Sequence, residues 1–169
     1  MNYGPLILAK LRDEKTKLIE TKAKDKFYLL QFAEDDLNFQ IRYKDLDKLG
    51  IVVDYISIHK RTPILDVEIL TKKLEQQAQE IQERLIYLLE AFKLLELDKM
   101  NKRAQLRSYP PYKDSDSKYY YEIVLDEANR IHFQRYQYSK TEKRFEKITS
   151  QFTLEIFERL INDLVDILK

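Results

Sequence analysis

The longest regular pattern of apolar positions lies in the middle of the chain, between Thr62 and Met100. From residue 74 onward its apolar side chains recur at alternating steps of four and three, at Leu74, Ala78, Ile81, Leu85, Leu88, Phe92 and Leu95. This heptad spacing is typical of a helix that buries one narrow stripe against a partner helix. Thr62 as the N-cap and Pro63 at the first helical position give the helix a start. The pattern predicts one unbroken helix of about 35 residues, roughly 50 Å long.

Three segments before this helix have the features of β-strands. Residues 27–32 are apolar and aromatic, residues 37–43 alternate apolar with polar side chains, and residues 51–59 are rich in β-branched side chains. The polar residues 33–36 between the first two segments predict a turn. An antiparallel group of strands is therefore expected to lead into the long helix.

The segment from residue 5 to residue 22 is ambiguous. Its apolar residues fit a weak helical stripe with Pro5 at the first position, or two short strands over residues 6–11 and 17–21. The polar residues 13–16 between the two strands are typical of a turn, and the helical stripe has a gap at its middle. The pattern favours the hairpin and leaves the helix as the alternative.

The part of the chain after the long helix repeats the order of strands and then a helix. Residues 108–117, with Pro110 and Pro111, predict an extended loop. Strands are expected over residues 119–125, 130–138 and 145–152, with a hairpin turn over residues 126–129. Thr153 is expected to cap a final helix, whose apolar residues are Leu154, Phe157, Leu160, Ile161, Leu164 and Leu168.

These elements place the chain in the α+β class, with two groups of antiparallel strands separated by one long helix and closed by a C-terminal helix. The corresponding division is an N-terminal, mainly β lobe (1–61), a connecting helix (62–100) and a C-terminal lobe (101–169). A single domain is the alternative. No repeat of residues between the two halves supports a duplication.

Composition restricts the class of protein further. Hydrophobic residues make up 44% and charged residues 35% of the chain, and only two glycines and four prolines occur, so most of the chain is expected to be regular structure. The absence of cysteine excludes disulfides, thiolate metal sites and cysteine nucleophiles. No apolar run is long enough to span a bilayer, and no pattern of a signal peptide is present. We expect a soluble, cytoplasmic protein.

Self-association is the leading functional hypothesis from the sequence. In the first half of the long helix only the heptad seam is apolar, and the other side chains are Lys, Gln, Glu and Arg. Such a narrow seam requires a partner helix, from this chain or from a second copy. The expected protein is a non-enzymatic interaction or assembly protein, a homo-oligomer formed through Leu74, Ala78, Ile81 and Leu85.

A nucleic-acid-binding module is the alternative hypothesis. Residues 99–147 carry seven lysines and five arginines against seven acidic residues, although the whole chain has a formal charge of only +1. Basic and aromatic side chains gather on one predicted hairpin, at Arg130, Arg135, Tyr136, Tyr138, Lys143 and Arg144, with Arg103, Arg107, Tyr109 and Tyr112 just upstream. Cations for phosphates and rings for base stacking are what a single-stranded nucleic-acid surface needs. The simpler explanation is a half-exposed sheet face on which basic side chains cover the rings.

Candidate catalytic residues are few. Asp13, Glu20 and Lys22 form an acid followed by an acid-x-lysine, the residue types that bind Mg²⁺ and stabilise hydroxide in metal-dependent nucleases. Their spacing is short, so a solvated charged hairpin is the simpler explanation, and a small nuclease or hydrolase is the third hypothesis. Whether the protein is an enzyme is left open.

The remaining polar motifs have structural explanations. His59 and His132 lie singly on predicted strands without a second ligand at metal-site spacing, and Asp114 and Asp116 lie in the proline-rich loop. Glycine occurs only at positions 4 and 50, which excludes a glycine-rich phosphate-binding loop. No cofactor and no resident metal is expected.

Overall fold

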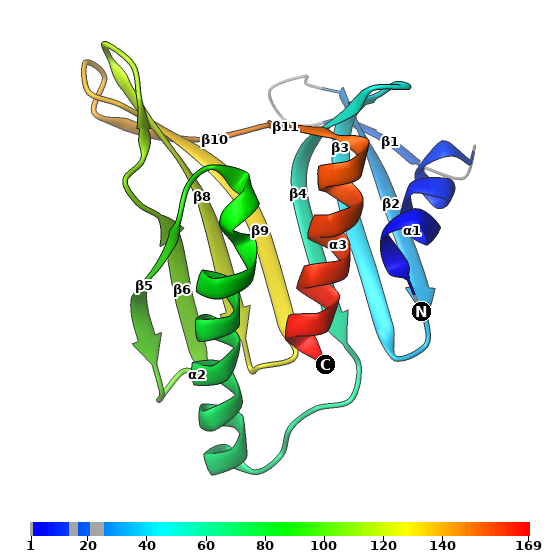
Figure 1. Ribbon diagram of the computed structural model, residues 1–169, viewed down its shortest axis with the longest axis vertical. Coiled ribbons are helices and arrows are strands. Elements are labelled where there is room, and N and C mark those ends of the chain that lie inside the picture. The colour runs from blue at the N-terminus through cyan, green and yellow to red at the C-terminus, as the bar shows by residue number, and fades with distance from the viewer. Residues whose placement is uncertain (1, 14–16, 21–25) are drawn as a thin grey trace.

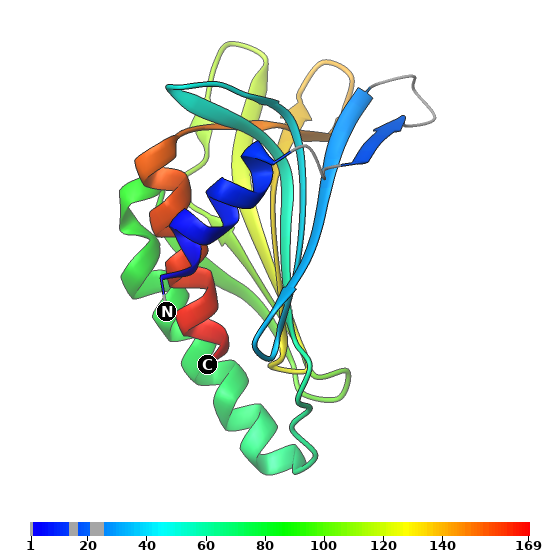
Figure 2. The same ribbon diagram turned by 90° about the vertical axis from the view of Figure 1, so that its right-hand side faces the viewer.

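One antiparallel sheet with helices on a single face makes up the protein (Figures 1 and 2). The computed structural model describes residues 2–13, the backbone of residues 17–20, and residues 26–169. The sheet has eleven strands in the order β1-β2-β3-β4-β9-β8-β6-β5, with β10 beside β9, β11 beside β4 and β7 beside β8. The α+β class and the antiparallel strand groups on either side of a central helix are confirmed. No helix among the described residues combines the length and apolar character needed to cross a membrane.

The sheet consists of two similar halves, each a helix followed by a meander of strands. The first half contains α1 (Tyr3–Arg12), β1 (Lys17–Glu20), β2 (Lys26–Glu34), β3 (Leu37–Leu46) and β4 (Gly50–Lys60). The second contains α2 (Val67–Arg84), the 3₁₀ helix η1 (Leu85–Leu88), β5 (Phe92–Asp98), β6 (Arg103–Ser108), β7 (Tyr112–Lys113), β8 (Ser117–Asp126) and β9 (Arg130–Ser139). The last strands of the two halves, β4 and β9, pair antiparallel at the centre of the sheet. The two strand groups therefore share one continuous sheet.

A crossing segment, β10 (Arg144–Ile148) and β11 (Ser150–Thr153), connects the two halves at the end where β4 and β9 separate. It pairs first with β9, up to Ile148, and then with β4, from Ser150. The single strand expected over residues 145–152 is therefore two strands with different partners. The segment leads directly into α3 (Leu154–Leu168), whose N-cap is Thr153, as expected. The Thr153 side chain accepts a hydrogen bond from the Ile156 N–H at 3.2 Å.

The core lies between the sheet and the helices. Every second row of directly paired residues across the sheet presents apolar side chains to the helices, as in the fully buried row formed by Ile41, Ile56, Phe133, Ile123 and Leu106. Helix α3 covers the centre of these rows with the side chains Phe157, Leu160, Ile161 and Leu164, all completely buried. Full burial of one such side chain contributes about 1.5–3 kcal/mol. The period-two pattern of the strands exists because only this face of the sheet is covered.

The predicted helix of about 35 residues is wrong in its length. Helix α2 begins at Val67, with Asp66 rather than Thr62 as the N-cap, and the Asp66 Oδ1 accepts a hydrogen bond from Ile69 N–H at 3.0 Å. The helical turns end at Leu88, because Leu89 adopts a left-handed backbone conformation with φ of 65°. Residues 92–98 then form β5, which pairs with β6. The strands β5 and β6 are absent from the sequence-based expectation.

The preferred hairpin over residues 5–22 is also wrong in its first strand. Residues 3–12 form helix α1, and its buried side chains Tyr3, Ile7, Leu8 and Leu11 recur at helical spacing. Gly4 lets α1 approach α3 closely, since a Cβ there would lie 2.4 Å from the Glu158 carbonyl oxygen. Residues 17–20 form a strand, as expected, and the expected turn residues 14–16 lie outside the described part of the chain.

Replacing Leu89 with glycine is expected to raise the free energy of unfolding by about 1 kcal/mol, because glycine adopts positive φ without the cost that a Cβ imposes. The Leu89 side chain is 95% exposed, so its removal loses no buried contact. Urea denaturation measures the change. The control is Ile86→Gly, at an exposed position of η1 that lacks positive φ, where glycine should destabilise the protein. A loss of stability in Leu89→Gly would instead indicate a continuous helix through residue 89.

Candidate functional site

The face of the sheet opposite the helices, called the open face below, is not covered by any helix of the described residues (Figure 2). Its polar and aromatic side chains include Asn38, Gln40, Arg42, Tyr55, Ser57, His59, Arg103, Gln105, Arg107, Tyr120, Arg130, His132, Gln134, Tyr136 and Tyr138. Two hollows on this face differ in chemistry.

The first hollow, the aromatic groove, lies over β5, β6, β8 and β9 and has a volume of about 480 Å³. It is lined by Leu95, Arg107, Ser108, Tyr109, Pro111, Lys113, Lys118, Tyr120, Tyr138 and Phe145. Three of these residues are basic and none is acidic. The lining therefore attracts anions while presenting flat rings.

Arg107 lines the aromatic groove beside two adjoining rings, Tyr120 and Phe145, whose centroids are 5.6 Å apart. Its guanidinium carbon is 4.7 Å from the centroid of Tyr120 and 5.6 Å from that of Phe145, both within cation–π range. An ion pair with Glu122, at 3.0 Å between Nη2 and Oε2, fixes the guanidinium from one side. The buried Arg107 Nε has no hydrogen-bond partner within the described residues. Burial raises the pKa of Tyr120, so its hydroxyl stays protonated at neutral pH.

The rim of the groove is aromatic and exposed. Tyr109 and Phe145 are both about half exposed, which is unusual for rings of this size. Tyr112 pairs with Tyr119 across β7 and β8 and therefore lies on the other face of the sheet. The Lys93 Nζ lies 4.2 Å from the Tyr109 centroid, and the Phe145 ring is 5.3 Å from that of Tyr138. Exposed rings beside a cationic base form a surface on which further rings can stack.

The predicted nucleic-acid contacts are divided by the alternation of β9. Tyr138 lines the aromatic groove, and the Tyr136 ring lies 6.3 Å from that of Phe145. Arg135 points to the helix layer, where it pairs with Glu90 at 2.9 Å, and Arg130 lies at the far end of the strand in the second hollow. Lys143, in the turn before β10, and Arg144, the first residue of β10, are not part of the groove lining. Arg144 pairs with Glu146 in an exposed ion pair, and Lys143 has a φ of 52°.

The four predicted self-association residues are buried inside the single chain. Leu74, Ala78, Ile81 and Leu85 have at most 2% of their surface exposed and belong to the core cluster under the sheet. Their heptad seam therefore packs on the chain's own sheet. The exposed apolar residues of this region are Leu65, Val67 and Ile69, at the start of α2.

The predicted nuclease set is not brought together by the described residues. Asp13 is exposed at the C-terminal end of α1, whereas the Glu20 side chain and Lys22 lie outside the described part. Within that described part, no group of three or more His, Asp or Glu side chains could hold a metal ion.

Asp114 and Asp116 stabilise turns. Asp114 accepts hydrogen bonds from the Tyr119 hydroxyl and from the backbone N–H groups of Asp116 and Ser117, which lower the pKa of its carboxyl. Asp116 accepts from the Thr141 side chain and backbone and from the Ser139 hydroxyl, with the same effect on its pKa. Asp116 thereby ties the turn before β8 to the turn after β9.

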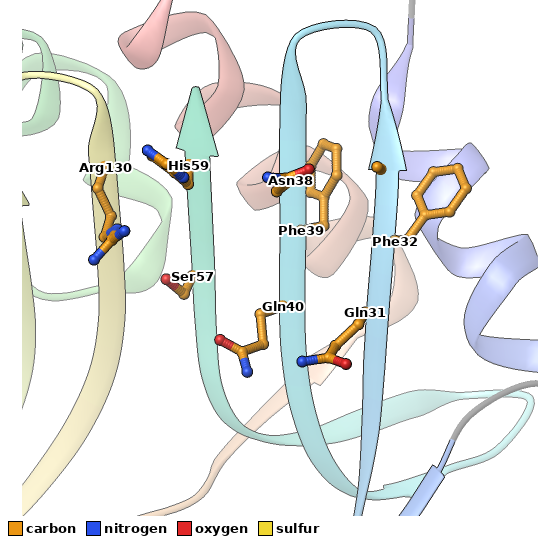
Figure 3. Close-up of a pocket in the computed structure, with 9 residues that line it drawn as sticks. Gln31, Phe32, Asn38, Phe39, Gln40, Ser57, His59 and Arg130 are labelled. Atoms are coloured by element: carbon orange, nitrogen blue, oxygen red, sulfur yellow. The ribbon is translucent and has the colours of Figure 1, made fainter. Parts of the chain in front are cut away.

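The second hollow, the polar depression, lies over β2, β3, β4 and β9 and has a volume of about 540 Å³ (Figure 3). It is lined by Gln31, Phe32, Ala33, Asn38, Phe39, Gln40, Ser57, His59 and Arg130. Burial and the neighbouring Arg130 both lower the pKa of His59, so its imidazole is neutral at pH 7. His132 lies in the neighbouring row of the open face, where burial also lowers its pKa and Gln134 Oε1 is 3.1 Å from its Nε2.

No protein-family model, no curated protein and no solved structure matches the chain. The chemistry of the two hollows is therefore what indicates a function. Sequence reasoning placed Arg107 and Tyr109 near the basic segment but missed Phe145, Lys113 and Lys118. The pairing of β6 and β7 with β8, of β8 with β9 and of β9 with β10 brings these side chains together.

Proposed function

We propose that this protein binds single-stranded nucleic acid in the aromatic groove. The observation that carries the proposal is the Arg107 guanidinium, which lies beside the adjoining Tyr120 and Phe145 rings in a groove that contains two further cations and no lining carboxylate. Arginine planes and aromatic rings are the two surfaces on which unpaired bases stack. The arrangement supplies both within one hollow.

The exposed rim favours a single strand over a duplex. Base–aromatic stacking contributes about 1–3 kcal/mol per base and requires a base whose flat face is free. Tyr109 and Phe145 present their rings at the surface of the groove. The bases of a duplex are stacked on each other and have no free face for these rings. Lys113 and Lys118 lie at the same groove and form no ion pair within the described residues, so both are free to bind phosphates.

The charge distribution is consistent with a local site. The chain as a whole is close to neutral, with a formal charge of +1, so long-range attraction of a polyanion is weak. The excess of base over acid is concentrated in residues 99–147, which contribute most of the groove lining. Binding is therefore expected to depend on this groove rather than on net charge.

Self-association is the second candidate, on the exposed apolar residues Leu65, Val67 and Ile69. Three apolar side chains exposed within five residues are enough for a small contact and too few for a large interface. The predicted seam residues of α2 do not contribute to this surface, because they are buried.

The double variant Lys113→Gln/Lys118→Gln is expected to weaken binding of oligothymidine about tenfold at low salt, because two phosphate contacts are lost. It should also reduce the slope of log K against log salt by about 1.4, at roughly 0.7 per contact on a single strand. Fluorescence anisotropy with a labelled oligomer of about 15 nucleotides measures both. The variant Phe145→Leu, which keeps all charges, should weaken binding with little change in the salt slope.

The matched control is Lys44→Gln/Lys48→Gln, which removes the same charge from two exposed lysines around the turn between β3 and β4. This control should bind like the unmodified protein. Equal weakening in both double variants would mean that attraction is non-specific, and absence of binding at low salt would remove the proposal altogether.

A further inference from the structure

The polar depression is formed by two neighbouring rows of directly paired residues. In the first row, Asn38 pairs with His59 and His59 pairs with Arg130 across β3, β4 and β9. In the second, Gln31, Gln40 and Ser57 are partners in the same way. Directly opposed residues of antiparallel strands lie about 4.5–5.5 Å apart at their Cα atoms, so these side chains converge on one spot. Figure 3 shows them on four adjacent strands.

The surface is hollowed here because two positions carry small side chains. Ala33 follows Asn38 in the first row, and Ser57 follows Gln40 in the second. Their neighbours are longer amide, imidazole and guanidinium groups, which form the walls. The depth of the hollow therefore depends on the small side chains at Ala33 and Ser57.

The polar side chains of the depression have no partner among the described residues. Gln31, Asn38, Gln40, Ser57, His59 and Arg130 form no side-chain hydrogen bond or ion pair with any residue that the structure describes. Several polar groups elsewhere on the open face are paired: Arg42 with Asp54, Arg107 with Glu122, and His132 with Gln134. The depression thus gathers six polar side chains whose donors and acceptors remain available for a ligand.

The lining favours an anion. Arg130 is its one fixed charge, and no carboxylate lines the hollow. A guanidinium binds carboxylate and phosphate oxygens through two parallel N–H groups. The side-chain amides of Asn38 and Gln40 and the Ser57 hydroxyl can each donate and accept hydrogen bonds. They can therefore pair with hydroxyl or amide groups of a ligand.

We infer that the polar depression binds an oxyanion, a phosphate or a carboxylate, between Arg130 and His59, as part of a small ligand whose hydroxyl or amide groups pair with Asn38, Gln40 and Ser57. The site is independent of the aromatic groove, and it does not extend the nucleic-acid surface. Of its two lining rings, Phe39 is buried in the core and Phe32 packs on Phe39, so neither offers a face for base stacking.

Binding at this site is coupled to protonation of His59. Arg130, its partner on β9, disfavours the imidazolium, whereas Asp36 and Glu127, in the turns beside it, favour it, and Asn38 on β3 is neutral. A bound anion opposes the effect of Arg130 and raises the pKa of His59. Anion affinity is therefore expected to rise as pH falls, by about threefold between pH 8 and pH 6.

Sulfate is the first probe, because it does not titrate between about pH 5.5 and 8, where imidazole does. The His59 ring signals are followed by NMR on the full chain, at an ionic strength held constant with sodium chloride. Sulfate should cause saturable shifts and raise the His59 pKa, and Arg130→Gln should abolish both. The matched control Arg103→Gln removes an exposed arginine elsewhere on the open face and should leave both intact.

Further probes separate the sources of the oxyanion. Acetate tests a carboxylate, and glucose 6-phosphate against inorganic phosphate tests whether the amides bind the body of a ligand. Tighter binding of glucose 6-phosphate, lost in Asn38→Ala/Gln40→Ala, supports the full inference. The inference is overturned if the NMR shifts caused by sulfate fail to saturate, or if they persist in an Arg130→Gln variant whose backbone spectrum is native. Neither outcome depends on whether the aromatic groove binds oligothymidine.

Discussion

Replacing Glu90 with alanine is expected to lower the free energy of unfolding by about 3 kcal/mol, because it leaves the Arg135 charge buried without a partner. The two side chains are only 11% and 14% exposed, and Oε2 lies 2.9 Å from Nη1. The Glu90 Oε1 also accepts a hydrogen bond from the Ser108 hydroxyl at 3.1 Å. Urea denaturation measures the loss.

The expected size of this effect follows from the number of elements that meet at Glu90. Arg135 on β9 lies 4.1 Å from the Tyr121 ring on β8, and the Ser108 oxygen on β6 accepts the Tyr121 N–H at 2.8 Å. Glu90 itself follows the left-handed turn that ends η1. The ion pair thus joins the end of the helical segment to three strands of the sheet.

Glu146→Ala is the matched control, because Glu146 and Arg144 form an ion pair with the same 2.9 Å separation but with both side chains exposed. Exposed pairs contribute at most about 1 kcal/mol, so this variant should change stability little. The double variant Glu90→Leu/Arg135→Met should recover part of the loss, since it leaves no unpaired charge. A cost for Glu90→Ala no larger than that of the control would show that water reaches the pair.

Arg135 was predicted from the sequence as a nucleic-acid contact, whereas in the structure it forms the ion pair with Glu90. Arg135→Met is expected to lower stability and to leave oligothymidine affinity unchanged, because the side chain lies on the helix side of the sheet. Adjacent residues on a strand point to opposite faces, so a cluster in sequence separates into two surfaces. Tyr136 and Tyr138 share a face with each other and not with Arg135.

The strands that were predicted correctly are those with one covered face. Residues 37–43 alternate because the odd-numbered side chains meet the helices and the even-numbered ones lie on the open face. The C-terminal helix was recognisable because α3 buries one face, with apolar side chains at steps of three and four residues. In both cases burial in the fold produces the period that the sequence displays.

Strand β5 was not predicted from the sequence, because a bulge interrupts the alternation of its apolar and polar residues. Its register shifts between Leu94 and Glu96, so Leu95 is an extra residue against β6. Apolar residues pairing toward the helix layer therefore fall at Phe92, Leu94 and Leu97, with steps of two and three instead of two throughout. Steps of two and three residues fit a helical stripe as well as a strand. By coincidence, the heptad spacing of α2 also continues into β5, at Phe92 and Leu95.

The candidate site was only partly within reach of sequence analysis. Tyr138 was predicted from its neighbours on the hairpin, but Arg107 and Lys118 come from other strands. These side chains lie close together because β6 pairs with β8 and β10 pairs with β9. Such non-local register is not encoded in the composition of any one segment.

Replacing Ile81 with alanine is expected to lower the free energy of unfolding by about 3 kcal/mol and to leave the molecular mass in solution unchanged. Ile81 is fully buried beneath the sheet, and removing its outer carbons leaves a cavity that the core fills only in part. Urea denaturation and light scattering at micromolar concentration measure the two quantities. Val67→Lys is the control on the exposed start of the same helix, and it should barely alter stability.

The pair of variants separates two forms of self-association. A mass that falls only in Val67→Lys would indicate that copies meet through the exposed start of α2, with the heptad seam still inside each chain. A mass that falls in Ile81→Ala, under conditions where the variant remains folded, would mean that α2 leaves its own sheet to pair with another copy. Such an exchange would expose the apolar row under α2, at a cost of about 1.5–3 kcal/mol for each side chain uncovered. The buried position of Leu74, Ala78, Ile81 and Leu85 therefore argues that the seam stabilises the single chain.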